Sequence, residues 1–533
     1  PTRYRGGVTD LMSAEHSKNM KRVVIIGGGI TGLAAAHRVL ELTRESSQKT
    51  ALTILESSNR VGGIVETHAR DGFLLESGPD SFISEKPAAL DLARRLGLHS
   101  RIIETNANHR RSLIVRRGRL LPVPEGFHLL APSRFWPFVK SDIFSWIGKA
   151  RMALDLILPR RIMNGSARVT NDESLADFVR RRLGREALDR MAQPMVGGIY
   201  TADPEQLSLL ATMPRFLEME RDHRSVIRAL RQQGSRPTVG ERLENDDQTN
   251  GARYSLFLSF DRGMQVLTDT LAERISYLTS QIVRDSEVSE NAPALKNAIR
   301  LNTPVESISL VHDEAGVASE DSPRWIVKTA GNETLSADAI CLALPSYVSA
   351  RLLDNIDSQL ASELDGIPYA SSATINLAFR REDVQHPLDS FGFVVPFSEN
   401  RSIIACTFSS VKFAARAPSG SVLLRAFAGG ALQPEILKLD DSELLSRVRM
   451  DLRDLLGIEQ TPLFAEVSRW HRSMPQYHLG HIERVKRIER RAGALPGLVL
   501  AGNAYTGLGI PDCIRNGEAA AEQIWDRRNL GVR

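Results

Sequence analysis

The sequence predicts an α/β fold in which a nucleotide-binding domain with a parallel sheet is interrupted by long inserts. A strand, a glycine-rich turn, a helix and a second strand follow one another between residues 22 and 56. Another strand, glycine-rich turn and helix return near the C-terminus, over 495–525. The chain between them carries helical and β patterns of its own, so we expect one domain to be assembled from both ends of the chain.

The first elements follow directly from residue type. The run RVVIIG (22–27) is continuously apolar, as a strand buried on both faces of a parallel sheet requires. The stretch TGLAAAHRVLELTRE (31–45) places apolar residues at helical spacing, and ALTILE (51–56) has the composition of a second strand. Together they predict one βαβ unit.

Glycines between the first strand and the helix fit the spacing G-x-G-x-x-G. Gly27 permits the sharp turn, Gly29 lets the backbone approach a pyrophosphate, and Gly32 lets the helix pack closely on the sheet. The helix N-terminus offers free N–H groups and a partial positive charge to phosphates. Glu56 ends the second strand, where an acid can accept hydrogen bonds from ribose hydroxyls. The combination predicts a bound dinucleotide rather than a plain glycine-rich turn.

Residues 56–63, ESSNRVGG, favour FAD over NAD as this dinucleotide. Arg60, Gly62 and Gly63 form an R-x-G-G element directly after the acid. A second loop of this kind would bring a cation and backbone N–H groups to the phosphates of the long FAD molecule. The element is similar to that of the amine oxidase and desaturase group of flavoproteins. This resemblance implies a Rossmann-like FAD-binding domain with an inserted β-rich substrate domain and a helical domain.

The patterns along the chain predict the following domain organisation. Residues 1–19 are polar and are expected to form a disordered tail, and the stretch 232–252 is expected to be a loop or insertion. The five remaining parts are FAD-binding segments at 21–90, 253–315 and 466–528, a basic helical domain at 91–230, and a β-rich substrate domain at 316–465.

Composition excludes several function classes. The 533 residues are 42% hydrophobic and 25% charged, the formal net charge is only +4, and no nucleic-acid-binding signature occurs. Cys341, Cys406 and Cys513 are too few and too scattered for a disulfide framework, and no metal cluster is visible. No stretch approaches the roughly 20 uninterrupted apolar residues of a transmembrane helix, and residues 1–19 lack the apolar region of a secretory signal. We therefore expect a cytoplasmic protein.

Four further motifs narrow the resemblance: GPDSF (78–82), GIYTADPEQLSL (198–209), RWHRSMPQYHLGH (469–481) and GIPDCIRNG (509–517). With these in this order, the chain resembles the oxygen-dependent porphyrinogen oxidases of haem biosynthesis from about residue 21 to 526. It is most similar to their soluble bacterial type, the coproporphyrinogen III oxidases, also called protoporphyrinogen oxidases. Asp80 supports this type, because the animal enzyme has Arg and the plant enzyme Asn at the matching position.

The resemblance implies FAD contacts at matching positions, in addition to Arg60, Gly62 and Gly63. These are Gly27, Gly28, Gly29, Ile30, Thr31, Gly32, Glu56, Ser57, Ile64, Gly78, Pro79, Asp80, Ser81, Val305, Trp470, Gly509, Ile510 and Pro511. Backbone N–H groups at the start of the last helix could face the flavin carbonyl where reduction builds negative charge. No catalytic acid or base is implied, because the flavin carries the chemistry.

The implied reaction is the six-electron oxidation of coproporphyrinogen III to coproporphyrin III, with O2 as acceptor and H2O2 as product. Protoporphyrinogen IX is the alternative substrate. Two other classes stay open. An FAD amine oxidase or desaturase would share the N-terminal motifs but not MPQYHLGH or GIPDCI, and a non-catalytic flavoprotein would bind FAD without turnover. A homodimer is compatible with the resemblance.

The carboxylates of a porphyrinogen call for Lys or Arg side chains. Lys86, just after GPDSF, is the substrate-binding candidate that the resemblance implies, although a solvated lysine explains it nearly as well. The run 109–124 predicts a basic hairpin with Gly118 in its turn, more simply a solvated edge than a propionate site. Residues 91–230 hold 24 Lys and Arg against 15 Asp and Glu, a surplus that would steer a polyanion toward the cleft.

The stretch FWPFVKSDIFSWIGKARMALDLILP (135–159) is apolar and contains two tryptophans. Its spacing suits packing within a helical domain, and lysines and aspartates interrupt it. We therefore favour a core or channel wall here over a peripheral membrane face, which stays the alternative.

Overall fold

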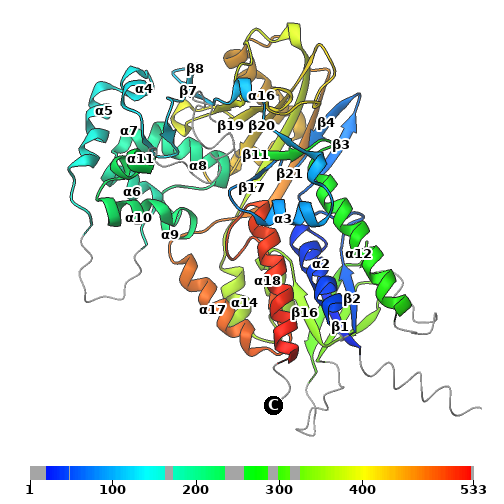
Figure 1. Cartoon of the computed structure of the whole chain (residues 1–533). Coiled ribbons are helices and arrows are strands. Elements are labelled where there is room, and N and C mark those ends of the chain that lie inside the picture. The colour runs from blue at the N-terminus through cyan, green and yellow to red at the C-terminus, as the bar shows by residue number, and fades with distance from the viewer. Residues whose placement is uncertain are drawn as a thin grey trace, which may run out of the picture.

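The computed structural model describes residues 20–46, 49–161, 172–233, 257–285, 298–311 and 324–529 (Figure 1). The predicted tail at 1–19 and nearly all of the predicted loop at 232–252 lie outside the described residues.

A five-stranded parallel sheet forms one body of the molecule. Its order is β12-β2-β1-β16-β22, with bounds β12 Ile299–Arg300, β2 Thr50–Leu55, β1 Lys21–Ile26, β16 Ala339–Leu342 and β22 Leu498–Leu500. Val23 of β1 pairs with Leu52 on one side and Ala339 on the other. Because the strands are parallel, their carboxyl ends share one edge, and the glycine-rich turn leaves β1 at that edge.

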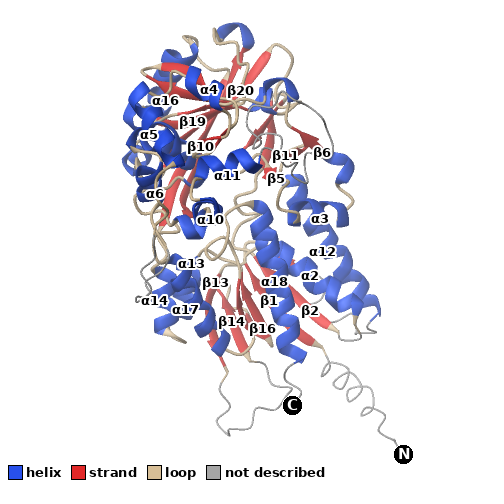
Figure 2. Cartoon of the chain, turned by 60° about the vertical axis from the view of Figure 1, so that its left-hand side comes forward, coloured by secondary structure: helices blue, strands red, loops and turns tan. Residues whose placement is uncertain are grey.

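The parallel sheet is buried on both faces, which explains its continuous apolar runs. Val23 and Ile25 pack against one helical layer, while Val24 and Ile26 face the opposite layer. Figure 2 shows the two layers on either side of the strands. The first layer contains α2 Ile30–Glu45, α3 Ala88–Arg95, α12 Gln265–Asp285 and α18 Ile510–Asn529. The second contains β13 Val305–Leu310, β14 Trp325–Thr329, β15 Thr334–Ala337, α13 Ser346–Leu353, α14 Ser358–Asp365 and α17 His481–Ala494.

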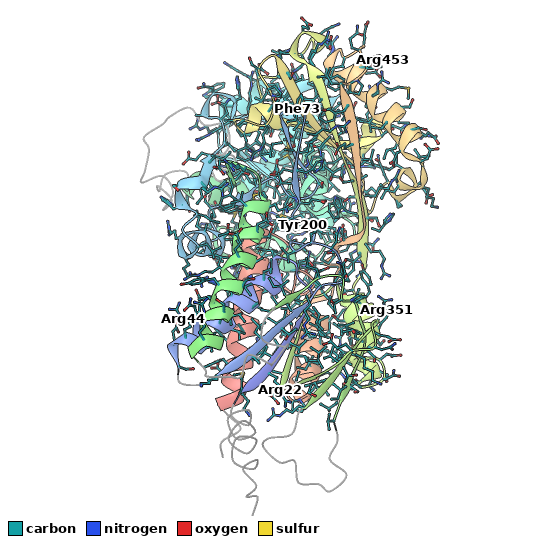
Figure 3. The ribbon with its side chains drawn as sticks, turned by 90° about the vertical axis from the view of Figure 1, so that its right-hand side faces the viewer. Arg22, Arg44, Phe73, Tyr200, Arg351 and Arg453 are labelled. Atoms are coloured by element: carbon teal, nitrogen blue, oxygen red, sulfur yellow. The ribbon has the colours of Figure 1, made fainter. Side chains whose placement is uncertain are left out.

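A seven-stranded sheet builds the second body. Its order is β21-β17-β20-β19-β18-β7-β8. The strands are β21 Phe464–Pro475, β17 Tyr369–Arg380, β20 Ser421–Gly429, β19 Ile403–Phe408, β18 Gly392–Val394, β7 Leu113–Arg116 and β8 Arg119–Pro122. Helix α16 (Asp441–Leu456) covers one face through Leu444, Val448 and Leu452. Figure 3 separates the bodies, with Phe73 and Arg453 in the upper one and Arg22, Arg44 and Arg351 in the lower one.

Short helices beside the seven-stranded sheet enclose a third core that contains Phe178, Met191 and Phe216. They are α4 Phe135–Lys140, α5 Trp146–Ala153, η3 Leu154–Leu156, α6 Leu175–Arg182, α7 Arg185–Ala187, the π-helical stretch η4 Leu188–Ala192, α8 Gln193–Tyr200, α9 Leu209–Thr212, α10 Pro214–His223 and α11 Val226–Gln233. Across the described ranges, no helix has both the length and the apolar character needed to span a membrane.

The remaining described elements are short and join these bodies. They are β3 Thr67–Arg70, β4 Phe73–Glu76, β5 Phe82–Ile83, η1 His99–Arg101, β6 Ile102–Glu104, η2 Ala107–His109, β9 Phe127–His128, β10 Ala131–Pro132, β11 Phe257–Phe260, η7 Arg381–Asp383, η8 Phe397–Glu399, α15 Ser409–Lys412 and η9 Pro434–Lys438. Strands β5, β11 and β6 form a small antiparallel sheet, and β3 with β4 forms a hairpin.

Strand pairing differs from two of the predicted domain boundaries, those at residues 316 and 466. β14 pairs with β13 and with β15, and β16 pairs with β1, so residues 325–342 lie with the parallel sheet although they follow the predicted boundary at residue 316. β21 pairs with β17, so the last FAD-binding segment cannot begin at residue 466. The predicted basic hairpin within 91–230 joins the seven-stranded sheet, because β7 pairs with both β8 and β18. Each error has the same cause, because local periodicity does not report which strand a strand will pair with.

A buried ion pair stabilises the helical part. Asp155 and Arg182 have side chains only 0% and 1% exposed, and Arg182 Nε donates to Asp155 Oδ1 over 2.7 Å. Ser225 Oγ and the Ile227 N–H donate to the other carboxylate oxygen over 2.6 and 3.0 Å. Every oxygen of the buried carboxylate is therefore satisfied.

Arg182→Met should lower the stability of the helical part sharply, because it leaves the Asp155 charge buried without its cation. Loss of one partner of a buried pair costs about 3–5 kcal/mol. Urea unfolding followed by circular dichroism measures the loss. Arg221→Met is the control, because Arg221 pairs with Asp222 on the surface and both side chains are exposed. Equal unfolding midpoints for the two variants would contradict this account.

Candidate functional site

The glycine-rich turn after β1 is closed so tightly that two of its glycines cannot be replaced. Gly27 adopts a φ of 109°, and an added Cβ there would lie 2.4 Å from the Ala343 carbonyl oxygen. A Cβ on Gly32 would lie 1.9 Å from the Gly27 carbonyl oxygen, so α2 can approach β1 only because residue 32 lacks a side chain. Both roles predicted for these glycines, the turn and the close packing, agree with this geometry.

Gly29 differs from its neighbours, because an added Cβ would meet no protein atom within 4 Å. It is the N-cap of α2, has no side-chain cap, and begins the helix with ordinary extended angles. Ile30 and Thr31 follow as the first buried residues of the helix. The open space beside Gly29 therefore lies where the unpaired N–H groups of the helix start can bind an anion.

Glu56, which directly follows β2, binds the backbone of the glycine-rich turn after β1. Glu56 Oε2 accepts the Gly28 N–H over 2.7 Å. Its Oε1 accepts both the N–H and the hydroxyl of Ser58 over 2.8 Å, and the Ser57 hydroxyl lies 3.3 Å away. These hydrogen bonds therefore fix the orientation of the Glu56 carboxylate.

The R-x-G-G loop lies directly against the first turn. Gly62 N–H donates to the Gly28 carbonyl over 2.9 Å, and Gly29 and Gly62 form a parallel bridge. Arg60, predicted as a cation for the phosphates, makes these contacts within the loop itself. Its guanidinium donates to the Val65 and Gly63 carbonyls over 3.1 and 2.6 Å and forms an ion pair with Glu66. Arg60 therefore stabilises the loop. Its contact with a phosphate stays a prediction.

Residues 76–81 continue the site from this loop toward the seven-stranded sheet. A Cβ on Gly78 would lie 1.7 Å from the Ile64 carbonyl oxygen, so the two segments touch backbone to backbone. Side chains from four different strands donate to carbonyls of 76–81. The pairs are Asn376 with Glu76, Trp470 with Ser77, Arg425 with Gly78 and Ser259 with Asp80. Trp470, a predicted cofactor contact, therefore also fixes this segment.

The Asp80 side chain is held by cations of the second body. Lys412 Nζ lies 2.9 Å from both carboxylate oxygens, the Ser81 hydroxyl donates over 2.7 Å, and Arg425 lies 3.6 Å away. Burial pushes the pKa of Asp80 upward, but Lys412 and Arg425 outweigh it and hold the pKa well below its usual value. Asp80 is therefore an anion at neutral pH.

Glu76 is the second acid of this segment and is almost completely buried. It accepts the Thr67 hydroxyl over 2.6 Å and the Met264 N–H over 2.9 Å. Burial nevertheless raises the pKa of Glu76 to about 7, against the lowering effect of these hydrogen bonds and of Arg416 and Arg425.

The C-terminal helix brings the third part of the site. Gly509, Ile510 and Pro511 form its start, and Asp512 lies in its first turn with a side chain only 3% exposed. Lys86 Nζ lies 2.5 Å from Asp512 Oδ2. The lysine is thus not a free solvated side chain, although it keeps 45% exposure and can face a ligand on its open side. Val305, the remaining predicted contact, is partly buried at the start of β13.

Two predicted surfaces lie away from this site. The basic run forms the hairpin of β7 and β8 at the sheet edge, with Arg117 and Gly118 in the turn. In the apolar stretch 135–159, Phe138, Phe144 and Met152 are buried as favoured, but Trp136 and Trp146 are 68% and 72% exposed. The favoured interpretation as core or channel wall is wrong for these tryptophans, because both lie on short helices that bury only one side.

The two cations that hold residues 78–80 were missed in the sequence. Lys412 gives no local signal, because nothing in its neighbourhood distinguishes it from a surface lysine. Arg425 does, because it interrupts the apolar strand run SVLLRAFAG, where a charge needs a buried partner.

The donor set fits FAD. The open space beside Gly29, at the helix start of Ile30, suits a pyrophosphate. The helix start at Ile510 suits a carbonyl of the flavin ring, and the fixed carboxylate of Glu56 suits a ribose. Among the residues that the structure describes, no group of His, Cys, Asp and Glu side chains is arranged to hold a metal ion.

Comparison with known proteins agrees with the family predicted from the motifs. The chain is 33% identical over 505 residues to the coproporphyrinogen III oxidase of Bacillus subtilis, covering 95% of this chain and 98% of the relative. The coproporphyrinogen III oxidase of Propionibacterium freudenreichii is 34% identical, covering 95% and 90%. The chloroplastic protoporphyrinogen oxidase of Nicotiana tabacum is 27% identical, covering 94% and 85%.

Solved structures confirm the predicted fold class. An Exiguobacterium protein provisionally named protoporphyrinogen oxidase superposes with a TM-score of 0.75 at 30% identity, covering 95% of this chain and 98% of its own. A putrescine oxidase variant superposes with a TM-score of 0.61 at 17% identity, which shows the fold alone. The model of the flavin containing amine oxidoreductases matches residues 30–525. The chain therefore belongs to the flavin containing amine oxidoreductase family: it is a flavoenzyme, and FAD is its cofactor.

Proposed function

We propose that this flavoenzyme oxidises coproporphyrinogen III to coproporphyrin III, with O2 as the electron acceptor and H2O2 as the second product. The observation that carries the proposal is the 33% identity with the Bacillus subtilis coproporphyrinogen III oxidase over nearly the whole of both chains. Protoporphyrinogen IX is the alternative substrate, because relatives that carry that name match at 26–28% identity.

FAD would supply the redox chemistry, taking two electrons from the macrocycle in each of three steps and passing them to O2. The protein's part is to hold and orient it. Glu56 would bind the adenosine ribose, and Gly28, Gly29 and Gly62 would bring backbone to the pyrophosphate. The helix start at Gly509–Pro511 would place its positive end against the flavin. The other predicted contacts, Ile64, Pro79, Ser81 and Val305 among them, stay part of this proposal.

Gly29→Val should abolish FAD retention while the protein still folds. The added Cβ enters the open space beside the helix start, where it meets no protein atom within 4 Å, so we expect the side chain to block the cofactor and not the fold. The absorbance of the purified protein near 450 nm measures flavin content, and circular dichroism measures folding. Gly331→Val is the matched control, because its Cβ also meets almost nothing. A normal flavin spectrum in Gly29→Val would refute the pyrophosphate assignment.

A side-by-side assay of coproporphyrinogen III and protoporphyrinogen IX in air tests the proposed substrate. Porphyrin fluorescence follows the product of each reaction. We expect coproporphyrin III to form at least tenfold faster at equal low substrate concentration. Faster formation of protoporphyrin IX would establish the alternative, and no turnover of either substrate by the yellow, FAD-loaded protein would reject both.

Lys86→Met should raise KM for coproporphyrinogen III more than it lowers kcat, if the exposed side of the ammonium binds a propionate in ground and transition state alike. The size of the change should be about tenfold, the usual weight of one charge-assisted hydrogen bond. Because Lys86 also pairs with Asp512 at the start of α18, FAD content must be measured in parallel. An unchanged KM with full FAD content would remove Lys86 from the substrate site.

We also propose two assembly properties. The exposed apolar side chains of α4 and α5, including Trp136 and Trp146, would form a peripheral membrane contact, since aromatic residues with neighbouring basic groups favour the lipid interface. A homodimer is the expected oligomeric state. Liposome flotation and analytical ultracentrifugation test these two properties.

A further inference from the structure

A cluster of five charged side chains lies between residues 76–81 and the seven-stranded sheet. It contains two acids and three cations, and none of their side chains is more than 16% exposed. The members are Glu76, Asp80, Lys412, Arg416 and Arg425. With both acids ionised, the cations still exceed the acids by one, so a net positive charge is enclosed in the protein.

The surplus charge is not neutralised by contact ion pairs. Arg416 directs its guanidinium to the Ser259 hydroxyl and to the Phe260 and Asp261 carbonyls, over 2.9 to 3.2 Å. Arg425 donates to the Gly78 carbonyl, and its buried Nε has no hydrogen-bond partner. Asp80 is paired with Lys412 at 2.9 Å and, over a longer distance, with Arg425 at 3.6 Å. The two acids therefore balance two of the three cations, and one positive charge remains to act on a neighbouring anion.

The order of contacts along the chain indicates which end of the cofactor would meet this cluster. Glu56, which would bind the ribose, contacts Gly28, and the next residue, Gly29, contacts Gly63. It then passes from Ile64 to Gly78, again by backbone contact. Asp80 and its cations lie beyond Gly78, on the far side of the pyrophosphate position from Glu56. A dinucleotide bound along this path directs its redox-active half toward the cluster.

We propose that this cluster raises the reduction potential of the bound flavin, and that Lys412 is the positioning residue that balances the Asp80 charge. The proposal rests on the FAD site described under the proposed function. Reduction adds negative charge to the flavin ring, and a fixed positive surplus in a site of low dielectric favours the charged product. Without Lys412, the Asp80 carboxylate would cancel the surplus and disfavour reduction.

Opposite substitutions in the Lys412–Asp80 pair provide the test. Lys412→Met should lower the two-electron midpoint potential of the FAD-loaded protein, and Asp80→Asn should raise it. With Arg425 3.6 Å from Asp80, we expect the carboxylate to stay ionised at pH 8 when Lys412 is removed. We expect at least a tenfold change in the reduction equilibrium for each, which is about 30 mV for a two-electron couple. The double variant should return close to the wild-type value.

The potentials are measured at pH 8 by equilibration with a reference dye, and sulfite titration of the oxidised flavin gives a second readout. Sulfite binding at the flavin, which also builds negative charge on the ring, should weaken in Lys412→Met and strengthen in Asp80→Asn. Lys412→Arg should leave the potential close to the wild-type value, because it keeps the positive charge. Lys438→Met is the matched control, since Lys438 pairs with Glu435 on the surface with 74% exposure.

Two single variants that shift the potential in the same direction, or by no more than the Lys438→Met control, would overturn the proposal. If Lys412→Met does not fold, the sign of the potential shift in Asp80→Asn alone decides whether the proposal holds. An absence of bound FAD in the wild-type protein would refute the proposed function itself. Bound FAD with unmoved potentials would refute only the role of the cluster.

Discussion

The attachment of residues 76–81 to the seven-stranded sheet is the constraint on which the site depends. Four carbonyls in six residues are bound by side chains from β17, β21, β20 and β11, so the backbone there can follow only one path. The same segment touches Ile64 backbone to backbone at Gly78. Because the R-x-G-G loop in turn pairs with the first glycine turn, this segment links the parallel sheet to the seven-stranded sheet.

This attachment also explains why charged residues are buried at the junction. A backbone segment that leaves its own sheet carries polar groups that neither body satisfies by regular pairing. Strands β17, β20 and β21 of the second body supply three of the four donors, and two of these, Asn376 and Arg425, face each other across β17 and β20. Arg425 brings a charge with it, and Asp80 with Lys412 completes a buried network. The structural requirement thus sets the electrostatic environment in which the flavin is expected to react.

Local sequence patterns predicted the parts of the site that are close in the chain. The strand–turn–helix over 22–45, the acid at Glu56 and the R-x-G-G loop all follow from residues within one short stretch, 22–63. The network around residues 76–81 could not be predicted in this way, because its partners are far away, with Lys412 lying 332 positions after Asp80 and Asn376 lying 300 after Glu76. The exposure of Trp146 was missed for a related reason, since apolar character indicates burial but does not say against what.

A crystal structure of the purified protein with its bound FAD tests the central claim most directly, because the claim concerns one continuous site built from three distant chain segments. We predict pyrophosphate density beside Gly29, the ribose at Glu56, and the flavin ring between residues 78–81 and the start of α18. Density for the ring on the far side of α18, away from Asp80 and Lys412, would contradict the account.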